Sequence, residues 1–292
     1  MCKFLARKTL FVAVLVCLPM ANLWADTPVW KVSKGEETVY LGGTIHILTA
    51  ADYPLPSAFD KAYAAAEILI FETDMDALTT PEFQAEMIQS VVYTDGRTLR
   101  DDISDETFAA LQEHTQSVGM PVEGLLNFKA GMVSITLTML ELQRLGFVGT
   151  GVDQFYSDKA KQDKKVLGEL ETPAEQLSFI VDMGVGEEDQ LLAYTLRDIK
   201  SMESMFKALK AAWRSGDNET MREMGLLPMK SDFPALYDLI LKDRNDNWMP
   251  RIEAMFKSPE VEFVLVGALH LVGEDGLLNQ LERDGYTIQQ LK

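Results

Sequence analysis

The sequence predicts an α/β protein. Its central sheet is built from two related strand–GxxH–helix–strand units at the N- and C-terminal ends, with a mostly helical middle insertion. Short apolar runs typical of buried strands lie near both ends, helix-start signals fill the middle, and the order strand, G-x-x-H, helix, strand occurs twice. No Pro-, Gly- or Ser-rich linker divides the chain, so we expect one domain after the leader.

The first elements follow from local turn and cap signals. Residues 29–43 are expected to form two strands around a Lys-Gly turn. A helix with Ser57 as its N-cap is expected over residues 57–67, because an acidic side chain three residues later can complete a capping box. The apolar run EILIFETD (67–74) is typical of a buried strand.

The middle of the chain carries strong helix signals. Helices are expected to begin after Thr80 and Ser104, since both residues are good N-caps and the first is followed by proline. A long apolar helical pattern covers residues 129–146. Thr172 opens a capping box with proline at the first helical position, and residues 187–257 are almost entirely helical in pattern.

The remaining elements complete the sheet. KKVLGELET (164–172) is expected to be a strand, and so are VEFVLVG (261–267) and YTIQQL (286–291). A helix over residues 276–285 separates the last two strands. Strands therefore lie at both ends of the chain and helices dominate its middle, as the fold class requires.

The repeated unit places one histidine at each of two strand ends. YLGGTIH (40–46) and VLVGALH (264–270) share the pattern strand, G-x-x-H, and each is followed by a helix and a strand. The chain has only three histidines, so finding His46 and His270 in the same context argues against coincidence. In open α/β sheets, ligands bind at the carboxyl ends of the strands.

The first 25 residues read as a secretory signal peptide. Residues 1–8 contain three basic and no acidic side chains, residues 9–25 are apolar, and Ala25 supplies a small residue for cleavage. A retained membrane anchor needs about 18 unbroken apolar residues, and Pro19 breaks this run. We therefore expect an exported, periplasmic protein of residues 26–292 with no stable membrane anchor after cleavage.

Composition excludes several classes of function. The formal net charge is −18, and removing the leader with its three basic residues makes it −21, so no nucleic-acid partner is expected. Both cysteines, Cys2 and Cys17, leave with the leader. The mature chain then has no disulfide, no cysteine nucleophile and no thiolate metal ligand. The oligomeric state stays open.

The strand-end residues suggest a metal site. Gly43 and Gly267 precede the two histidines, and glycine lets the backbone approach a bound group closely. Glu72 ends the strand that follows the first histidine. Two imidazoles and one carboxylate leave open positions for water, which suits a catalytic divalent metal ion. The alternative is that each histidine makes only local hydrogen bonds.

Five stretches along the chain carry a family resemblance. In order they are LGGTIHILTAADYPLPSAF, FETD, GVDQFYSDKAKQDKKVLGELETPAEQL, DRNDNWMPRI and FVLVGALHLVGEDGLLNQLERDGYTI. They are spread in this order along the chain from about Val29 to Leu291, and they resemble the TraB/GumN family, which includes the Tiki-type metalloproteases. The resemblance implies a single domain of this kind over residues 26–292.

The resemblance also implies a site. The family is marked by two G-x-x-H motifs and an acidic residue, which here match Gly43 with His46, Glu72, and Gly267 with His270. These residues would hold a divalent metal ion. Manganese or cobalt is favoured over zinc in the Tiki branch, and its identity here stays open.

Further residues are candidates with an alternative beside each. Arg244, Asn245 and Trp248 match the R-N-x-x-W stretch of the family; Arg244 would polarise a substrate carbonyl or orient Glu72, or would only cap a helix. Glu171 is a candidate general base, or a residue that stabilises the next helix. Asn245 is assigned with the two glycines to cofactor binding. Asp153 is a weaker candidate, and its alternative is an N-cap.

We therefore expect an exported, divalent-metal-dependent hydrolase, peptidase-like, that acts on a peptide or other small carbonyl compound. A metal-bound water held by His46, His270 and Glu72 would attack the carbonyl, with Glu72, Arg244 and Glu171 as the catalytic residues. Whether Glu72 is a ligand or the general base stays open. The alternative is a non-catalytic protein that binds or sequesters peptides in the same cleft.

Overall fold

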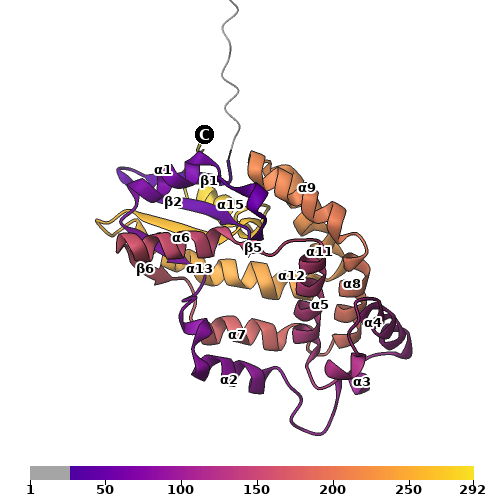
Figure 1. The fold of residues 1–292 in the computed structure, drawn as a ribbon. Coiled ribbons are helices and arrows are strands. Elements are labelled where there is room, and N and C mark those ends of the chain that lie inside the picture. The colour runs from indigo at the N-terminus through magenta and orange to yellow at the C-terminus, as the bar shows by residue number, and fades with distance from the viewer. Residues whose placement is uncertain (1–26) are drawn as a thin grey trace, which may run out of the picture.

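The computed structural model describes residues 27–292 (Figure 1), so the expected signal peptide over residues 1–25 lies outside the described residues. A mixed six-stranded sheet has the order β6-β4-β7-β2-β1-β8, and β3 pairs with β5 in a small second sheet. The strands are β1 (Val29–Lys34), β2 (Glu37–Thr44), β3 (Ile47–Leu48), β4 (Ile68–Phe71), β5 (Gly149–Thr150), β6 (Val166–Glu169), β7 (Glu262–Gly267) and β8 (Thr287–Gln290).

The centre of the sheet is parallel. Strand β7 lies between β2 and β4 and is parallel to both, and β4 is parallel to β6. Strand β1 is antiparallel to β2 and to β8. The carboxyl ends of β2, β7, β4 and β6 therefore meet at one edge of the sheet, which is where ligand sites of open α/β sheets form.

Helices make up most of the rest of the chain. They are α1 (Ser57–Ala65), α2 (Pro81–Ser90), α3 (Leu99–Asp102), α4 (Asp105–Ser117), α5 (Ala130–Arg144), α6 (Val152–Asp163), α7 (Pro173–Asp182), α8 (Glu188–Ile199), α9 (Met202–Ser215), α10 (Asn218–Met221), α11 (Leu227–Asp232), α12 (Pro234–Tyr237), α13 (Asp243–Met255), α14 (Ala268–Leu271) and α15 (Leu277–Arg283). Short 3₁₀ turns are η1 (Ala50–Asp52), η2 (Ala77–Thr79) and η3 (Val122–Gly124), and π-helical turns are η4 (Arg222–Leu226) and η5 (Asp238–Lys242). The expected caps of α2, α4 and α7, namely Thr80, Ser104 and Thr172, each accept a hydrogen bond from a backbone N–H three residues later.

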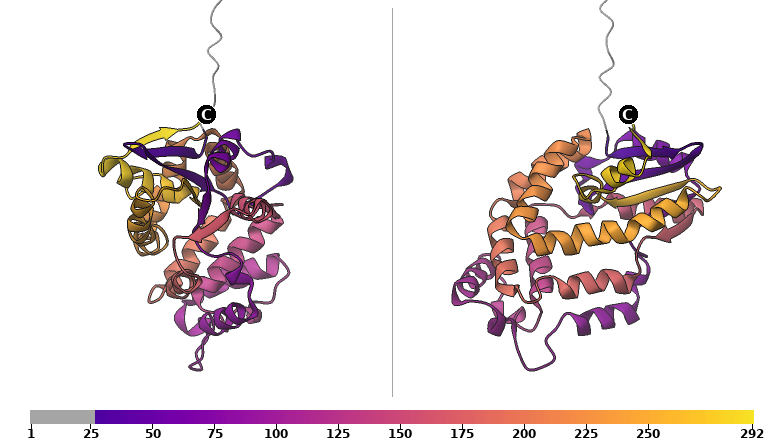
Figure 2. Two further views of the ribbon diagram at one scale, coloured as in Figure 1. Left: turned by 90° about the vertical axis from the view of Figure 1, so that its left-hand side faces the viewer. Right: turned by 180° about the vertical axis from the view of Figure 1, so that it is seen from behind.

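Both faces of the sheet are covered by helices. Phe59 of α1 and Tyr156 of α6 stack on each other and contact the ring of Phe263 in β7, so α1 and α6 cover the same face. Helices α13 and α15 lie on the opposite side (Figure 2, left). Helices α2, α4, α5, α7 and α8 gather beyond the carboxyl edge of the sheet, where they form the helical middle of the chain (Figure 1).

The structure confirms the α/β class, with a mixed sheet and mostly helical content, and corrects details. Helix α1 begins at Ser57 and Pro56 is its N-cap, so the serine is the first helical residue and does not cap. Strand β7 lies between β2 and β4, so the two G-x-x-H units are interleaved in the sheet, and their common origin stays a prediction. Within residues 27–292, no helix has the length and apolar character needed to cross a membrane.

Candidate active site

Four of the expected site residues follow strands at the carboxyl edge of the sheet. His46 comes two residues after β2, Glu72 directly after β4, and Glu171 two residues after β6. His270 lies in α14, which begins directly after β7. The pairing of β4 with β6 continues past the strands, because the amide of Glu171 donates to the carbonyl of Glu72 at 2.8 Å.

Glu72 is held from two sides. Its Oε1 accepts from the backbone N–H of Gly267 at 2.7 Å, and its Oε2 accepts from Nη2 of Arg244 at 2.6 Å. Burial opposes ionisation of this carboxyl, but the guanidinium of Arg244, the two imidazoles and the Gly267 N–H outweigh it and hold the pKa of Glu72 far below its ordinary value. Glu72 is therefore a carboxylate in a fixed orientation.

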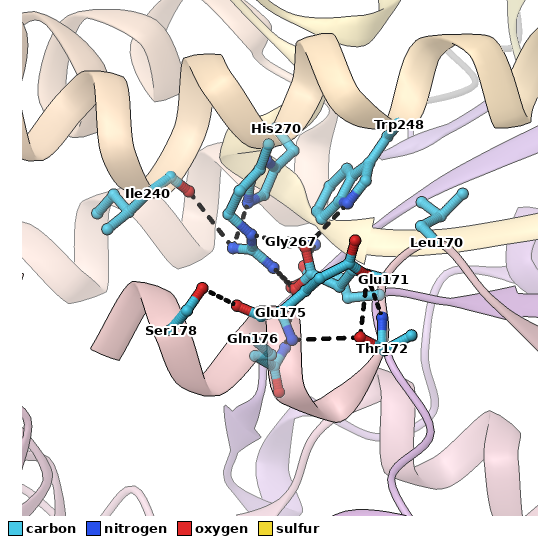
Figure 3. Close-up of polar contacts among 12 residues, drawn as sticks. Leu170, Glu171, Thr172, Glu175, Gln176, Ser178, Ile240, Trp248, Gly267 and His270 are labelled. Atoms are coloured by element: carbon cyan, nitrogen blue, oxygen red, sulfur yellow. Dashed lines mark hydrogen bonds and ion pairs between the residues drawn. The ribbon is translucent and has the colours of Figure 1, made fainter. Parts of the chain in front are cut away.

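Glu171 is the more deeply buried carboxyl, with its side chain 4% exposed. It accepts hydrogen bonds from Arg244, from Nε1 of Trp248 at 3.0 Å and from Nε2 of Gln176 at 3.3 Å (Figure 3). Burial raises the pKa of Glu171, and the charge of Glu72 adds to this, although its donors pull the other way. Two neighbouring carboxyls are thus shifted in opposite directions, a pattern common in catalytic sites.

Arg244 joins the two carboxylates to His270. Its Nε donates to Glu171 at 3.2 Å, its Nη2 donates to Glu171 and Glu72 at 2.6 Å each, and its Nη1 contacts His270 Nε2 at 3.2 Å and the Ile240 carbonyl at 3.3 Å. Ile240 belongs to the π-helical turn η5, a kind of helix defect frequent at functional sites. All five N–H groups of the guanidinium have a partner in this arrangement, and the contact with Glu72 orients that carboxylate.

The tautomer of His270 follows from its neighbours. The side-chain amide of Asn245 donates from Nδ2 to the carbonyls of His270 at 3.0 Å and Asp275 at 2.8 Å, so its Oδ1 is the atom that meets Nδ1 of His270 at 2.8 Å. Nδ1 therefore carries the proton, and Nε2 presents a lone pair to Arg244. Burial lowers the pKa of His270 to about 3, so the ring is neutral, and it packs on Trp248 at 4.5 Å between ring centroids.

His46 has different surroundings. Its side chain is 61% exposed, and its Nδ1 lies 3.1 Å from Oδ2 of Asp153 in the first turn of α6. Desolvation works against protonation, but the Asp153 carboxylate outweighs it and raises the pKa of His46. His46, Glu72 and Asp153 line a pocket of about 410 Å³, and Gln176 lies on its wall.

The two motif glycines have different roles. A Cβ added to Gly267 would lie 3.4 Å from Glu72 Oε1, 3.5 Å from His270 Cδ2 and 3.9 Å from His46 Nε2, so this glycine leaves open the space among the three predicted ligands. A Cβ on Gly43 would instead meet the backbone of Ala268 in α14 at 3.1 Å. Gly43 therefore lets α14 pack against β2 and does not face the site.

The donor chemistry fits a divalent metal ion. Metal-binding histidines usually donate their second ring N–H to an orienting partner, and His46 and His270 each have such a partner at Nδ1, namely Asp153 and Asn245. Arg244, however, holds the Nε2 of His270 and one oxygen of Glu72. As the side chains are placed, no three His, Cys, Asp or Glu residues among residues 27–292 are grouped closely enough to hold a metal ion.

The structure brings most of the predicted residues together. Glu72, Glu171, Arg244, Asn245 and His270 form one hydrogen-bonded network, which also contains Trp248. The third histidine, on α4, takes no part in it. Sequence reasoning missed Thr44 and Thr73, whose hydroxyl-bearing side chains line the pocket. The available signal was their position beside the motif residues His46 and Glu72.

The chain is similar to known proteins over most of its length. The chain is 26% identical to "Uncharacterized protein YbaP" of Escherichia coli (strain K12) over 253 residues, which cover 85% of this chain and 89% of the relative. The protein of the same name from Shigella flexneri matches to the same extent. No solved structure matches the chain significantly. The model of the TraB/PrgY/gumN family matches residues 28–290, and the chain therefore belongs to that family.

Proposed function

We propose that this protein is an exported, divalent-metal-dependent hydrolase, peptidase-like, that acts on a peptide or other small carbonyl compound at the carboxyl edge of the sheet. The observation that carries the proposal is the pair of strand-end histidines that lie near Glu72 at the same edge of the sheet. The Nδ1 of each histidine has a side-chain partner on a helix, Asp153 of α6 for His46 and Asn245 of α13 for His270, which leaves Nε2 as the ligating atom. Gly267 keeps the space among the three side chains open.

The ion would be held by His46, Glu72 and His270, and manganese, cobalt and zinc are the candidates. A divalent metal ion supplies Lewis-acid polarisation of a carbonyl and lowers the pKa of a coordinated water. Holding it by Nε2 of His270 requires Arg244 to release that atom, which removes one of the contacts that the guanidinium makes now. Arg244 would keep its contacts with both carboxylates.

The protein's own groups divide the remaining work. Glu72 lines the pocket and is ionised, so it is the carboxylate that faces the substrate. Glu171 does not line the pocket and acts through Arg244, so we assign it as a positioning residue rather than the general base. The apolar side chains of Phe71 and Leu265 line the same pocket and exclude water from part of it.

Metal titration of the mature chain tests the proposal. Residues 26–292 are freed of metal with a chelator, titrated with Mn²⁺, Co²⁺ and Zn²⁺ by calorimetry, and incubated with a peptide library that is read by mass spectrometry. We expect His46→Ala and His270→Ala to fold, as judged by circular dichroism, and to lose both metal binding and cleavage. His114→Ala, at the histidine outside the network, is the matched control and should keep both.

Two outcomes would contradict the proposal. Metal affinity retained in both His46→Ala and His270→Ala would remove the assigned ligands. Peptides that bind tightly but stay intact with every metal would favour the second candidate, a non-catalytic peptide-binding protein. The contact of Arg244 with the lone pair of His270 favours that alternative, because a cation already lies where the metal ion would bind.

Export is a separate part of the proposal and rests on the sequence of residues 1–25. Expression of the full chain in a bacterium, followed by osmotic-shock fractionation and mass spectrometry of the N-terminus, tests it. We expect the periplasmic fraction to contain a chain that begins at Asp26. A full-length chain that stays with the membrane would overturn cleavage after Ala25.

A further inference from the structure

Three buried polar atoms on the wall of the candidate pocket have no hydrogen-bond partner. They are Oγ1 of Thr44, Oγ1 of Thr73 and Oδ1 of Asp153. Thr44 is 2% exposed and Thr73 is 5% exposed. Within residues 27–292, six buried side-chain atoms lack a partner, and half of them belong to residues that line this one pocket.

Such a concentration calls for a physical reason. Buried polar groups in native proteins are nearly always paired, because an unpaired one has lost its water without gaining a partner. Thr44 ends β2 and Thr73 follows Glu72, so both hydroxyls lie at strand ends beside the proposed reaction centre. Asp153 uses only Oδ2 to orient His46. The missing partners are therefore expected from a bound ligand.

The charge of the lining indicates what kind of ligand group this is. The pocket is lined by the carboxylates of Glu72 and Asp153, and no lysine or arginine of the described chain lines it. A carboxylate or phosphate would find no cation there apart from His46. A group with several N–H donors and a positive charge would find acceptors at Thr44, Thr73 and Asp153.

We propose that this pocket binds a primary ammonium group of the substrate, such as the amino terminus of a peptide, through Thr44, Thr73 and Asp153. An ammonium has three donors and no acceptor, which matches three unpaired oxygens. Met75 and Leu78 line the same pocket and would contact the adjoining apolar side chain. This inference rests on the proposed function for its reaction and adds the substrate class: compounds with a free amino end.

Binding of a small amine to the metal-free mature chain tests the inference without any need for turnover. The probes are leucinamide and N-acetyl-leucinamide, which differ only in whether the amino group is free, and the readout is calorimetric affinity. We expect the free amine to bind about tenfold more tightly or better, as one or two hydrogen bonds to a charged group imply. In Thr44→Val and Thr73→Val, which keep side-chain shape, that ratio should fall several-fold.

Thr79→Val is the matched control. Thr79 lines the same pocket, but its hydroxyl already donates to the carbonyl of Asp76 at 2.8 Å, so this variant should keep the wild-type ratio. Equal affinities for the two probes, no detectable binding of leucinamide, or an unchanged ratio in both Thr44→Val and Thr73→Val would each overturn the inference.

The two proposals fail in different ways. If the free amine is preferred and both valine variants lose the preference, but no peptide is cleaved with any metal, the ammonium site stands and hydrolysis falls. If peptides are cleaved but N-acetylated and free peptides are cleaved and bound alike, hydrolysis stands and the ammonium site falls.

Discussion

The two G-x-x-H motifs end neighbouring parallel strands, yet their histidines have opposite environments. His46 is largely exposed on the pocket and is oriented by the charged side chain of Asp153. His270 is 7% exposed, packs on Trp248 and is oriented by the neutral side chain of Asn245. The motif places each histidine just after a strand. Residues more than twenty positions away in the sequence determine how deeply each ring is buried and which protonation state it has.

The difference follows from the cost of burying charge. A carboxylate beside an exposed imidazole favours the charged ring, and water solvates both groups. Beside the buried ring, a carboxylate in place of the Asn245 amide would add a third negative charge next to Glu72 and Glu171, which share the single guanidinium of Arg244. The amide orients the ring without adding charge. The exposed His46 can therefore change its protonation state, while the buried His270 is kept neutral.

Among the variants that test this comparison, Arg244→Gln is expected to have the largest effect on stability. Two buried carboxylates would lose their counter-charge, and we expect the free energy of unfolding to fall by about 3–5 kcal/mol, measured by urea denaturation. The control is Arg197→Gln, at an exposed arginine paired with Asp198 and Asp232, which should change the free energy of unfolding by less than about 1 kcal/mol. Added Mn²⁺ should raise the free energy of unfolding of Arg244→Gln more than that of the wild type. If Arg244→Gln lost less stability than the control, the account based on buried charge would be refuted.

The two motif glycines offer the next contrast. In Gly43→Ala the new methyl group meets Ala268 at 3.1 Å, so we expect a loss of about 1–3 kcal/mol from overpacking, with metal affinity kept. In Gly267→Ala the nearest atom is 3.4 Å away, an ordinary contact, so stability should hold while metal affinity falls at least tenfold. Thermal unfolding and calorimetry on both variants check this, and the reverse pattern would show that the roles are exchanged.

The histidines themselves should differ in stability effect. His270→Ala leaves Oδ1 of Asn245 and an N–H of Arg244 without partners, at a cost of about 1–3 kcal/mol. His46→Ala, at an exposed position, should stay within about 0.5 kcal/mol. Urea denaturation of the metal-free proteins distinguishes them, and equal losses would mean that the burial difference has no energetic weight.

The smallest effect concerns pH. Asp153→Asn gives the first motif the kind of partner that the second has. Because Asp153 raises the folded-state pKa of His46, its contribution to stability is present below the unfolded value near 6.5 and disappears as pH rises through the higher folded value. For so exposed a pair we expect at most about 1 kcal/mol, seen near pH 6 and absent near pH 10. Equal stability of variant and wild type at both pH values would show that the ion pair between His46 and Asp153 contributes nothing to stability.

Local signals in the sequence predicted the elements well. The caps at Thr80, Ser104 and Thr172 depend only on nearby backbone, so they could be read without a fold. The order of the strands could not, because placing β7 between β2 and β4 depends on contacts across about 190 residues. The position of β6 at the edge of the sheet, where most of its side chains are exposed, also could not be predicted, because it too depends on contacts between strands far apart in the sequence.

The site divides in the same way. The strand-end positions of His46, Glu72 and His270 followed from pattern, and the contact of Arg244 with Glu72 was one of two roles implied by resemblance. The sequence did not predict the contact of Arg244 with His270 or the unpaired hydroxyls of Thr44 and Thr73. Whether a side-chain atom finds a hydrogen-bond partner depends on every neighbour that packs around it.

The place of β7 also sets the order in which the molecule can be completed. This strand pairs with β2 and β4 at the middle of the sheet, yet it comes from residues 262–267, about 190 residues after β4 in the chain. Until it emerges from the ribosome, β2 and β4 have no common neighbour, and the nascent chain cannot close its sheet. A chain cut short before Glu262 would lose half of the candidate site together with the strand on which both halves are assembled.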